Sequence, residues 1–318
     1  MQLLGRGNTV QMKVSFSNNL SRCTCCPRRC DIDRLAGNIS VCRTGAYALV
    51  AHAGLHHGEE PPISGSRGSG TIFFAGCNLR CVFCQNWQIS QKFSKGDVRT
   101  MKPHELAEEM LRLQTGGAHN INFVSPSHVI WQMADAIALA REKGLTIPVV
   151  YNSGGYDSVE ALKEIRGLVE IYMPDIKYME REPARRYSGA ADYPEIIPGV
   201  LQEMYDQTGP LQTTSGGIAV KGLLVRHLVL PGLTENSKKC LDVVAAISKE
   251  IPVSIMSQYS PQYNAFRFPE INRTLLPEEY YEVVDYALAL GLETLYTQDI
   301  SSRDHYLPDF DREEPFEG

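Results

Sequence analysis

Short apolar runs alternate with longer amphipathic stretches from about residue 71 to residue 297. The short runs are rich in Val, Ile, Phe and Tyr, as buried strands are, and the longer stretches repeat apolar residues every three or four positions, as helices do. We therefore predict strands at 71–75, 121–124, 147–151, 169–173, 222–230, 253–258 and 293–297. Predicted helices occupy 103–115, 130–143, 157–166, 237–249 and 277–290, with broken helical structure over 183–208.

Repeated strand–helix units predict an α/β fold with a parallel sheet, because parallel strands need a crossover between them. Six or seven such units favour a partial (β/α)6 barrel of the TIM type. A flavodoxin-like open sheet is the alternative, and the number of units is high for that fold.

The two ends of the chain do not follow this alternation. Residues 1–65 are predicted to form a small Cys-rich N-terminal element that binds metal, joined to the barrel by the glycine-rich stretch 65–70. Residues 66–300 form the predicted core barrel. Residues 301–318 are acidic and are predicted to form a loosely attached C-terminal tail.

Composition narrows the function classes. The net charge of −6 gives no basic footprint for nucleic acid, and no apolar run approaches the roughly 20 residues of a membrane span. The N-terminus lacks the apolar core of a secretory signal. Nine cysteines, eight of them before residue 85, do not match a disulfide framework. The sequence therefore predicts a cytoplasmic protein that binds neither nucleic acid nor membranes.

Three cysteines follow the first predicted strand of the barrel. Cys77, Cys81 and Cys84 are spaced C-x3-C-x2-C on the loop after residues 71–75. A cubane 4Fe–4S cluster normally takes four thiolates, so three leave one iron open to a small chelating molecule. Zinc is the alternative, but it favours paired C-x2-C units and four protein ligands.

This motif resembles that of the radical S-adenosylmethionine (SAM) superfamily. The resemblance implies that the open iron binds the methionine end of SAM, and that an electron from the cluster cleaves SAM to a 5′-deoxyadenosyl radical. It also implies a barrel of the radical SAM type and a small electron donor such as flavodoxin or ferredoxin.

Within the superfamily, the chain is similar to relatives of the pyruvate formate-lyase activating enzyme. The segments GEEPPISG (58–65), GSGTIFF (68–74) and CQNWQIS (84–90) carry this similarity. It implies hydrogen abstraction from the glycine of a glycyl-radical enzyme as one candidate reaction. Radical modification of a small molecule or another macromolecule is a second, and a non-catalytic iron–sulfur or zinc protein with a redox or structural role is a third.

Polar residues stand at the carboxyl ends of three predicted strands, where parallel barrels place their active sites. Asp175 and Lys177 have the i, i+2 spacing that puts both side chains on one face of a strand. Arg226 has the fork geometry that binds a carboxylate. The turn that contains Asn152 and Gly154 resembles a SAM-contacting turn of activating enzymes. By this resemblance, all five residues are predicted to contact SAM.

A second cysteine group lies in the N-terminal element. Cys23, Cys26, Cys30 and Cys42 form C-x2-C-x3-C-x11-C, with Cys25 as a spare. Four thiolates within about 20 residues are a complete set for zinc or for an auxiliary iron–sulfur cluster. The sequence does not decide between the two.

Overall fold

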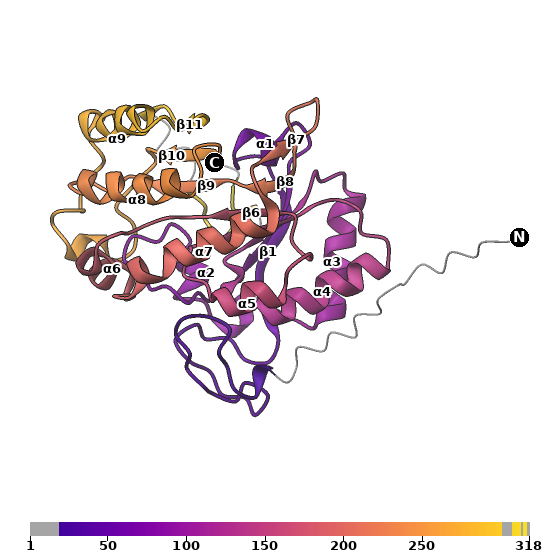
Figure 1. Cartoon of the computed structure of the whole chain (residues 1–318). Helices are drawn as coiled ribbons and strands as arrows, with labels where there is room; N and C mark the ends of the chain where they lie inside the picture. The colour runs from indigo at the N-terminus through magenta and orange to yellow at the C-terminus, as the bar shows by residue number, and fades with distance from the viewer. Residues whose placement is uncertain (1–18, 301–306, 313, 317–318) are drawn as a thin grey trace, which may run out of the picture.

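A computed structural model describes residues 19–300, 307–312 and 314–316. Parallel strands form a curved sheet with helices on its outer side (Figure 1). The strands that carry the barrel are β2 (Ser69–Phe74), β4 (Ile121–Val124), β5 (Val149–Ser153), β6 (Ile171–Pro174), β8 (Ala219–Leu223), β9 (Val225–Leu228), β10 (Val253–Met256) and β11 (Leu295–Thr297).

Two hydrogen-bonded sheets make up the barrel. Strands β2, β4, β5, β6 and β8 pair in parallel in that order, and β9, β10 and β11 form a second parallel set. A bridge between Asp175 and Arg226 joins β9 to the end of β6, so the two sets continue one another. Within the described residues no ladder connects β11 to the strands at the other edge, so the barrel is open. The predicted partial barrel is therefore confirmed.

The predicted strand 222–230 is instead two strands, since β8 ends at Leu223 and β9 begins at Val225. Gly222, next to the last residue of β8, has an unusual backbone conformation. This glycine has φ 125°, and a Cβ there would lie 2.4 Å from the Cα of Leu211. An L-residue rarely adopts this conformation, so glycine is favoured where the chain pairs with β6 at Gly222 and Leu223, before it pairs with β10 from Val225 onward.

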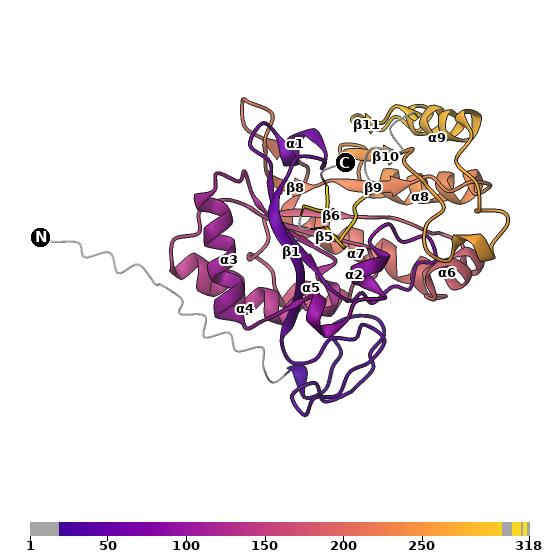
Figure 2. The ribbon, with the colours of Figure 1, turned by 180° about the vertical axis from the view of Figure 1, so that it is seen from behind.

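Helices cover the outer side of the sheet (Figures 1 and 2). They are α3 (Pro103–Thr115), α4 (Ile130–Glu142), α5 (Val159–Glu164), α6 (Arg181–Ser188), α7 (Tyr193–Thr208), α8 (Thr234–Ile247) and α9 (Pro277–Ala289). The helical stretch 183–208 is interrupted at Gly189, whose φ of 62° ends α6, whereas Pro198 lies inside α7 without ending it. None of the helices in the described part of the chain has both the length and the apolar character needed to span a bilayer.

Alternation along the strands divides the core into two faces. Ile72 and Phe74 belong to the large core beneath the helices. Val150 and Met173 face the interior of the barrel, where Ile63 of the short helix α1 (Pro61–Ser64) packs against them. The N-terminal element thus supplies apolar filling to the barrel interior.

The main sheet begins before the predicted boundary at residue 65. Strand β1 (Ala48–His56) pairs antiparallel with β2 and with the short strand β3 (Arg99–Met101). The described residues before β1 follow turns and bends around the second cysteine group. The segment 1–65 therefore contains a Cys-rich part and a strand that extends the barrel sheet.

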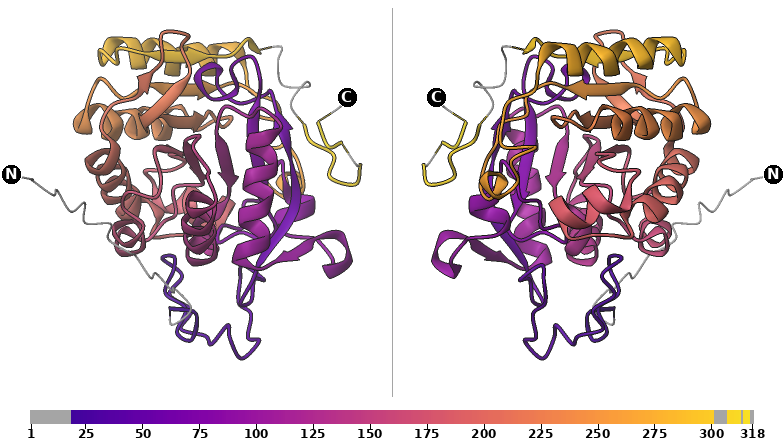
Figure 3. Two further views of the ribbon diagram at one scale, coloured as in Figure 1. Left: turned by 90° about the vertical axis from the view of Figure 1, so that its right-hand side faces the viewer. Right: turned by 90° about the vertical axis from the view of Figure 1, so that its left-hand side faces the viewer.

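The C-terminal segment packs on the sheet where it is described. The rings of Phe310 and Phe316 lie 5.4 and 5.2 Å from that of Phe73 on β2, measured between ring centroids. The predicted loose attachment is therefore wrong for residues 307–312 and 314–316, and the rest of the predicted tail lies outside the described residues. Figure 3 shows this yellow segment on the side of the sheet away from most of the helices.

Candidate active site

The loop with Cys77, Cys81 and Cys84 joins β2 to the short helix α2 (Trp87–Ser90). Its backbone is fixed from several directions, since the amide of Gly76 donates to Ile89 O at 2.9 Å and that of Arg80 donates to Ser188 O at 3.0 Å. Gly76 has φ 83°, and a Cβ there would lie 2.2 Å from the carbonyl oxygen of Cys42. Only glycine fits this position without displacing the N-terminal element.

Each of the three sulfur atoms has a polar neighbour. The Sγ of Cys81 lies 3.0 Å from Ser188 Oγ, and the Sγ of Cys84 lies 3.3 Å from Ser90 Oγ. The amide of Leu79 donates to Cys77 Sγ at 3.4 Å. Hydroxyl and amide donors of this kind stabilise cluster thiolates, so the donor set fits an iron–sulfur cluster.

Burial shapes the chemistry of these thiols. It raises the pKa of Cys77 to about 12 and that of Cys84 to about 11, and the nearby negative charge of Cys81 adds to both shifts. The metal-free thiols of Cys77 and Cys84 are therefore protonated at neutral pH, and metal binding must release their protons.

The predicted SAM contacts lie together beside this loop. Lys177 Nζ donates to Asp175 Oδ2 at 2.6 Å, and Arg226 Nε donates to Asp175 Oδ1 at 3.0 Å. Arg226 Nη2 also donates to Asn152 Oδ1 at 2.7 Å. A Cβ on Gly154 would lie 3.6 Å from Lys177 Cε and 2.9 Å from the side chain of Leu79. The five residues thus form one connected group that touches the cysteine loop.

Glu59 also belongs to this group, and the sequence analysis missed it. Its Oε2 accepts from Arg226 Nη1 at 3.2 Å, and its Oε1 accepts from Asn122 Nδ2 at 2.8 Å. Glu59 lies between β1 and α1, inside the segment predicted to be a separate element. In the sequence, Glu59 is visible only as one of two adjacent glutamates before two prolines. No local pattern indicates that this glutamate pairs with Arg226.

Burial and the neighbouring charges shift the pKa values of this group in opposite directions. Burial alone would raise the pKa of Asp175, but Lys177 and Arg226 outweigh it and hold the pKa below its usual range. For Lys177, burial would lower the pKa, but Asp175 raises it. Burial raises the pKa of Glu59 despite Arg226. Asp175, Lys177 and Arg226 therefore stay charged at neutral pH.

Residues 71–208 match the radical SAM superfamily. An uncharacterized protein of Methanocaldococcus jannaschii, MJ0674, is 30% identical over 297 residues, which cover 91% of this chain and 81% of the relative. The chain belongs to the radical SAM superfamily. This confirms the prediction of a radical SAM enzyme that uses a 4Fe–4S cluster and SAM.

Two further similarities are weaker. The pyruvate formate-lyase-activating enzyme of Clostridium pasteurianum is 23% identical over 208 residues, which cover 61% of this chain and 77% of that enzyme. The radical SAM chain also superposes on Streptococcus suis SuiB bound to S-adenosylmethionine with a TM-score of 0.49 and 14% identity. That match covers 70% of this chain and 48% of SuiB, so the chain spans about half the length of that protein.

The second cysteine group surrounds a buried arginine. Cys23, Cys26 and Cys42 are buried, as is Cys25, whose Sγ lies 3.6 Å from Cys23 Sγ. Cys30 is partly exposed. In the part of the chain described here, no three His, Cys, Asp or Glu side chains already converge as ligands of one metal ion. A single zinc ion would therefore require thiol side chains to rotate.

The guanidinium of this arginine, Arg34, faces sulfur. Its Nη2 lies 3.5 Å from Cys25 Sγ and 3.4 Å from Cys42 Sγ, and its Nη1 donates to His128 O at 2.7 Å. Arg34 is 1% exposed. A buried guanidinium needs a negative partner, and thiolates bound to a metal supply one. Cys25 therefore lies within this cluster of sulfur atoms.

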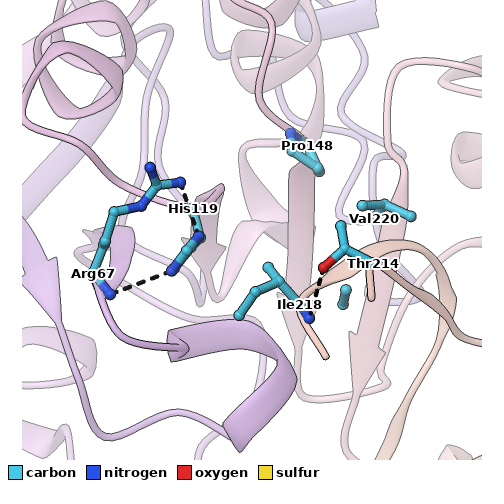
Figure 4. Close-up of a pocket in the computed structure, with 7 residues that line it drawn as sticks. Arg67, His119, Pro148, Thr214, Ile218 and Val220 are labelled. Atoms are coloured by element: carbon cyan, nitrogen blue, oxygen red, sulfur yellow. Dashed lines mark hydrogen bonds between the residues drawn. The ribbon is translucent and has the colours of Figure 1, made fainter. Parts of the chain in front are cut away.

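A surface pocket of about 270 Å³ lies elsewhere (Figure 4). It is lined by Arg67, His119 and Pro148, which precede β2, β4 and β5, and by residues of the β7–β8 hairpin, where β7 is Gln212–Thr213. Arg67 and His119 are hydrogen-bonded to one another there. This pocket is at the amino ends of the strands, opposite the cysteine loop, and is not the candidate active site.

Proposed function

We propose that this radical SAM enzyme abstracts a hydrogen atom from the glycine of a glycyl-radical enzyme. The observation that carries the SAM chemistry in this proposal is the electrostatic interaction of Lys177 with the cysteines of the loop, while Asp175 joins Lys177 to Arg226. A site for an amino acid cofactor needs charges for its ammonium and carboxylate groups, and these lie at the strand ends next to the loop.

In this proposal each side chain has a defined role. Cys77, Cys81 and Cys84 hold the cluster and leave one iron for SAM. Held at that iron, SAM would supply a 5′-deoxyadenosyl radical for hydrogen abstraction, through one-electron reductive cleavage of its C–S bond with release of methionine. Arg226 uses three of its five N–H groups on Asp175, Glu59 and Asn152, so two remain for the carboxylate of SAM.

Similarity to the activating enzyme of Clostridium pasteurianum supports the choice of substrate, because the name of that relative states that it activates pyruvate formate-lyase. A flavodoxin or a ferredoxin is the proposed electron donor. Asn152, Gly154 and Lys177 complete the proposed SAM site.

We also propose a second metal centre on Cys23, Cys26, Cys30 and Cys42, either zinc or an auxiliary iron–sulfur cluster. Burial of Arg34 among the sulfur atoms supports it. Because Cys25 lies among the same atoms, alanine variants of Cys25 and Cys26 should be compared for metal content. Loss of metal in Cys26→Ala but not in Cys25→Ala would support the proposed ligand set. Loss of metal in Cys25→Ala would show that Cys25 is a ligand and that the proposed set is wrong.

The first test is SAM cleavage. The protein is reconstituted anaerobically with iron and sulfide, reduced with dithionite and supplied with SAM, and 5′-deoxyadenosine is quantified. We expect product from the wild type and from Cys240→Ala, since Cys240 is a buried thiol on α8, but none from Cys81→Ala. No product from a wild type that carries its reduced cluster would overturn the reaction.

The second test concerns the substrate. Pyruvate formate-lyase prepared with deuterated glycine is added to the active enzyme. Deuterium in the 5′-deoxyadenosine, with a glycyl radical signal in electron paramagnetic resonance, would support the proposal. Cleavage of SAM with neither result would reject this glycyl-radical enzyme as the substrate and leave the SAM chemistry intact.

A further inference from the structure

The C-terminal segment, residues 309–312 and 314–316, makes an aromatic contact with the first strands of the sheet. The ring of Phe316 lies 4.1 Å from that of His56 on β1 and 5.2 Å from that of Phe73 on β2. Phe310 lies 5.4 Å from Phe73 and 5.9 Å from Phe316. The three phenylalanine pairs, at 5.2 to 5.9 Å, are within the range of favourable ring pairs, and His56 and Phe316 lie closer still.

Phe73 lies on the inner face of the barrel. Its neighbours Ile72 and Phe74 face the helices, so its own side chain points the other way. Along the parallel ladders Phe73 pairs with Val124, Val124 with Asn152, and Asn152 with Met173, which faces the barrel interior. The two C-terminal phenylalanines therefore contact the inner face of the barrel at Phe73, and Asn152 lies on the same face two strands away.

A polar contact ties the same segment to the region of the cysteine loop. Gln88 of α2 donates from Nε2 to Asp309 Oδ1 at 3.0 Å, and its Oε1 accepts from the amide of Phe310 at 3.0 Å. The segment closes on itself through Asp309 N and Pro315 O at 2.9 Å. Gln88 stands four residues after Cys84, so this contact is close in sequence to the cluster ligands.

The segment also lies at the open side of the barrel. It follows β11, one edge of the strand order, and contacts β1 and β2 at the other edge. Figures 2 and 3 show it on the side of the sheet opposite α5, α7 and α8. Its described residues contact the sheet and α2 through ring pairs and hydrogen bonds with side chains and form no ladder with a barrel strand, so their release would break no strand pairing.

We propose that residues 309–312 and 314–316 form a displaceable plug, which occupies the aromatic inner face of the barrel until an extended polypeptide substrate takes its place. This inference rests on the proposed function for its substrate, and it deepens that function by naming the face on which the polypeptide binds. The plug itself indicates the chemistry that binds there, which is aromatic side chains flanked by carboxylates.

The experiment uses the full-length chain with Phe310→Ala and Phe316→Ala together, and a fluorescent peptide of residues 307–316. In the wild type the tethered segment competes with the peptide, whereas in the double variant the face is free. We expect the peptide to bind the double variant at least about tenfold more tightly than the wild type, measured by anisotropy. Phe266→Ala is the control, because Phe266 is 61% exposed and far from the plug in the chain.

Pyruvate formate-lyase is then added as the competitor to the variant with bound peptide. Release of the peptide supports the proposal that the substrate takes the place of the plug, and retention of the peptide overturns it. Equal peptide binding to wild type and double variant, or no binding to either, overturns the plug itself. Neither readout requires SAM cleavage, so failure here is distinguishable from failure of the proposed reaction.

Discussion

Arg226 Nη1 donates a hydrogen bond of 3.2 Å to Glu59 Oε2, which joins β9 to a residue that precedes the first barrel strand. The Arg226 side chain is 17% exposed and that of Glu59 is 8% exposed. Arg226 also neutralises Asp175, so one guanidinium holds two buried carboxylates from distant parts of the chain. Stability of the barrel and charge at the active site therefore depend on the same residue.

Removal of Arg226 should be costly. In Arg226→Met the carboxylate of Glu59 loses its cation while Asp175 keeps Lys177, and removal of one partner of a buried ion pair typically costs about 3–5 kcal/mol. Chemical denaturation should show a loss in the free energy of unfolding of that order. Arg185→Met is the control, because Arg185 forms an exposed pair with Glu182 and should change little. Equal stability of the two variants would contradict the role of Arg226.

Gly154 should be sensitive to one added methyl group. In Gly154→Ala the new Cβ would lie 2.9 Å from Leu79 on the cysteine loop, so the loop and the proposed SAM site must shift apart. We expect the KM for SAM to rise by about three- to tenfold, equal to roughly 1 kcal/mol, with unchanged iron content. Gly96→Ala, where a Cβ meets nothing within 4 Å, should behave as the wild type. An unchanged KM would place SAM elsewhere.

Arg34 should be needed for metal at the N-terminal cysteines. Without its charge, anionic metal thiolates lose their buried counter-ion, so Arg34→Met should lower the metal content of this element and its melting temperature. Arg29→Met is the matched control, because Arg29 is on the same segment and its side chain is 65% exposed. If Arg34→Met keeps its metal and becomes more stable, the sulfur atoms around Arg34 are neutral thiols instead.

Docking of the plug on the sheet should become less stable in mild acid. Burial, together with the charge of His57, lowers the pKa of His56 to about 4, below the usual value near 6.5. A lowered histidine pKa means that docking is fully stabilised above about 6.5 and is lost as the pH falls toward 4. The neighbouring His52 faces other charges. Burial lowers the pKa of His52, and the positive charges of Arg99 and Arg112 lower it further, whereas the negative charge of Glu314 raises it.

Hydrogen–deuterium exchange of residues 307–316 at pH 7.5 and pH 5, corrected for intrinsic exchange, measures this effect. We expect faster exchange at pH 5 in the wild type and a smaller pH effect in His56→Phe, which keeps a ring opposite Phe316 but cannot be protonated. His104→Gln on the exposed start of α3 should resemble the wild type. The same pH response in His56→Phe would assign the effect to another group.

Local patterns predicted most of the barrel. Helix α3 begins at Pro103 and ends at Thr115, as its apolar period and flanking residues indicate. Asp175 and Lys177 were recognisable because their spacing puts both on one face of a strand. Strand β1 was missed because it contains Gly54 and two histidines, and it gains strand structure through its pairing with β2 and β3.

The interactions that sequence could not predict are those between distant segments. Glu59 reaches Arg226 across 167 residues, and no periodicity records such a contact. The same holds for Phe316, whose role depends on the ring of Phe73 on another element. The acidic composition of the C-terminus predicted loose attachment, because two aromatic side chains were outweighed by the charged residues around them.

The buried guanidinium of Arg34 has a consequence for how the protein is made. Its carbonyl partner, that of His128, lies 94 residues further along the chain, beyond the end of β4. During translation the N-terminal thiols therefore leave the ribosome well before the loop that shelters them exists. In that interval they are open both to metal delivery and to oxidation, and final closure of the N-terminal element waits for β4 to pair with the main sheet.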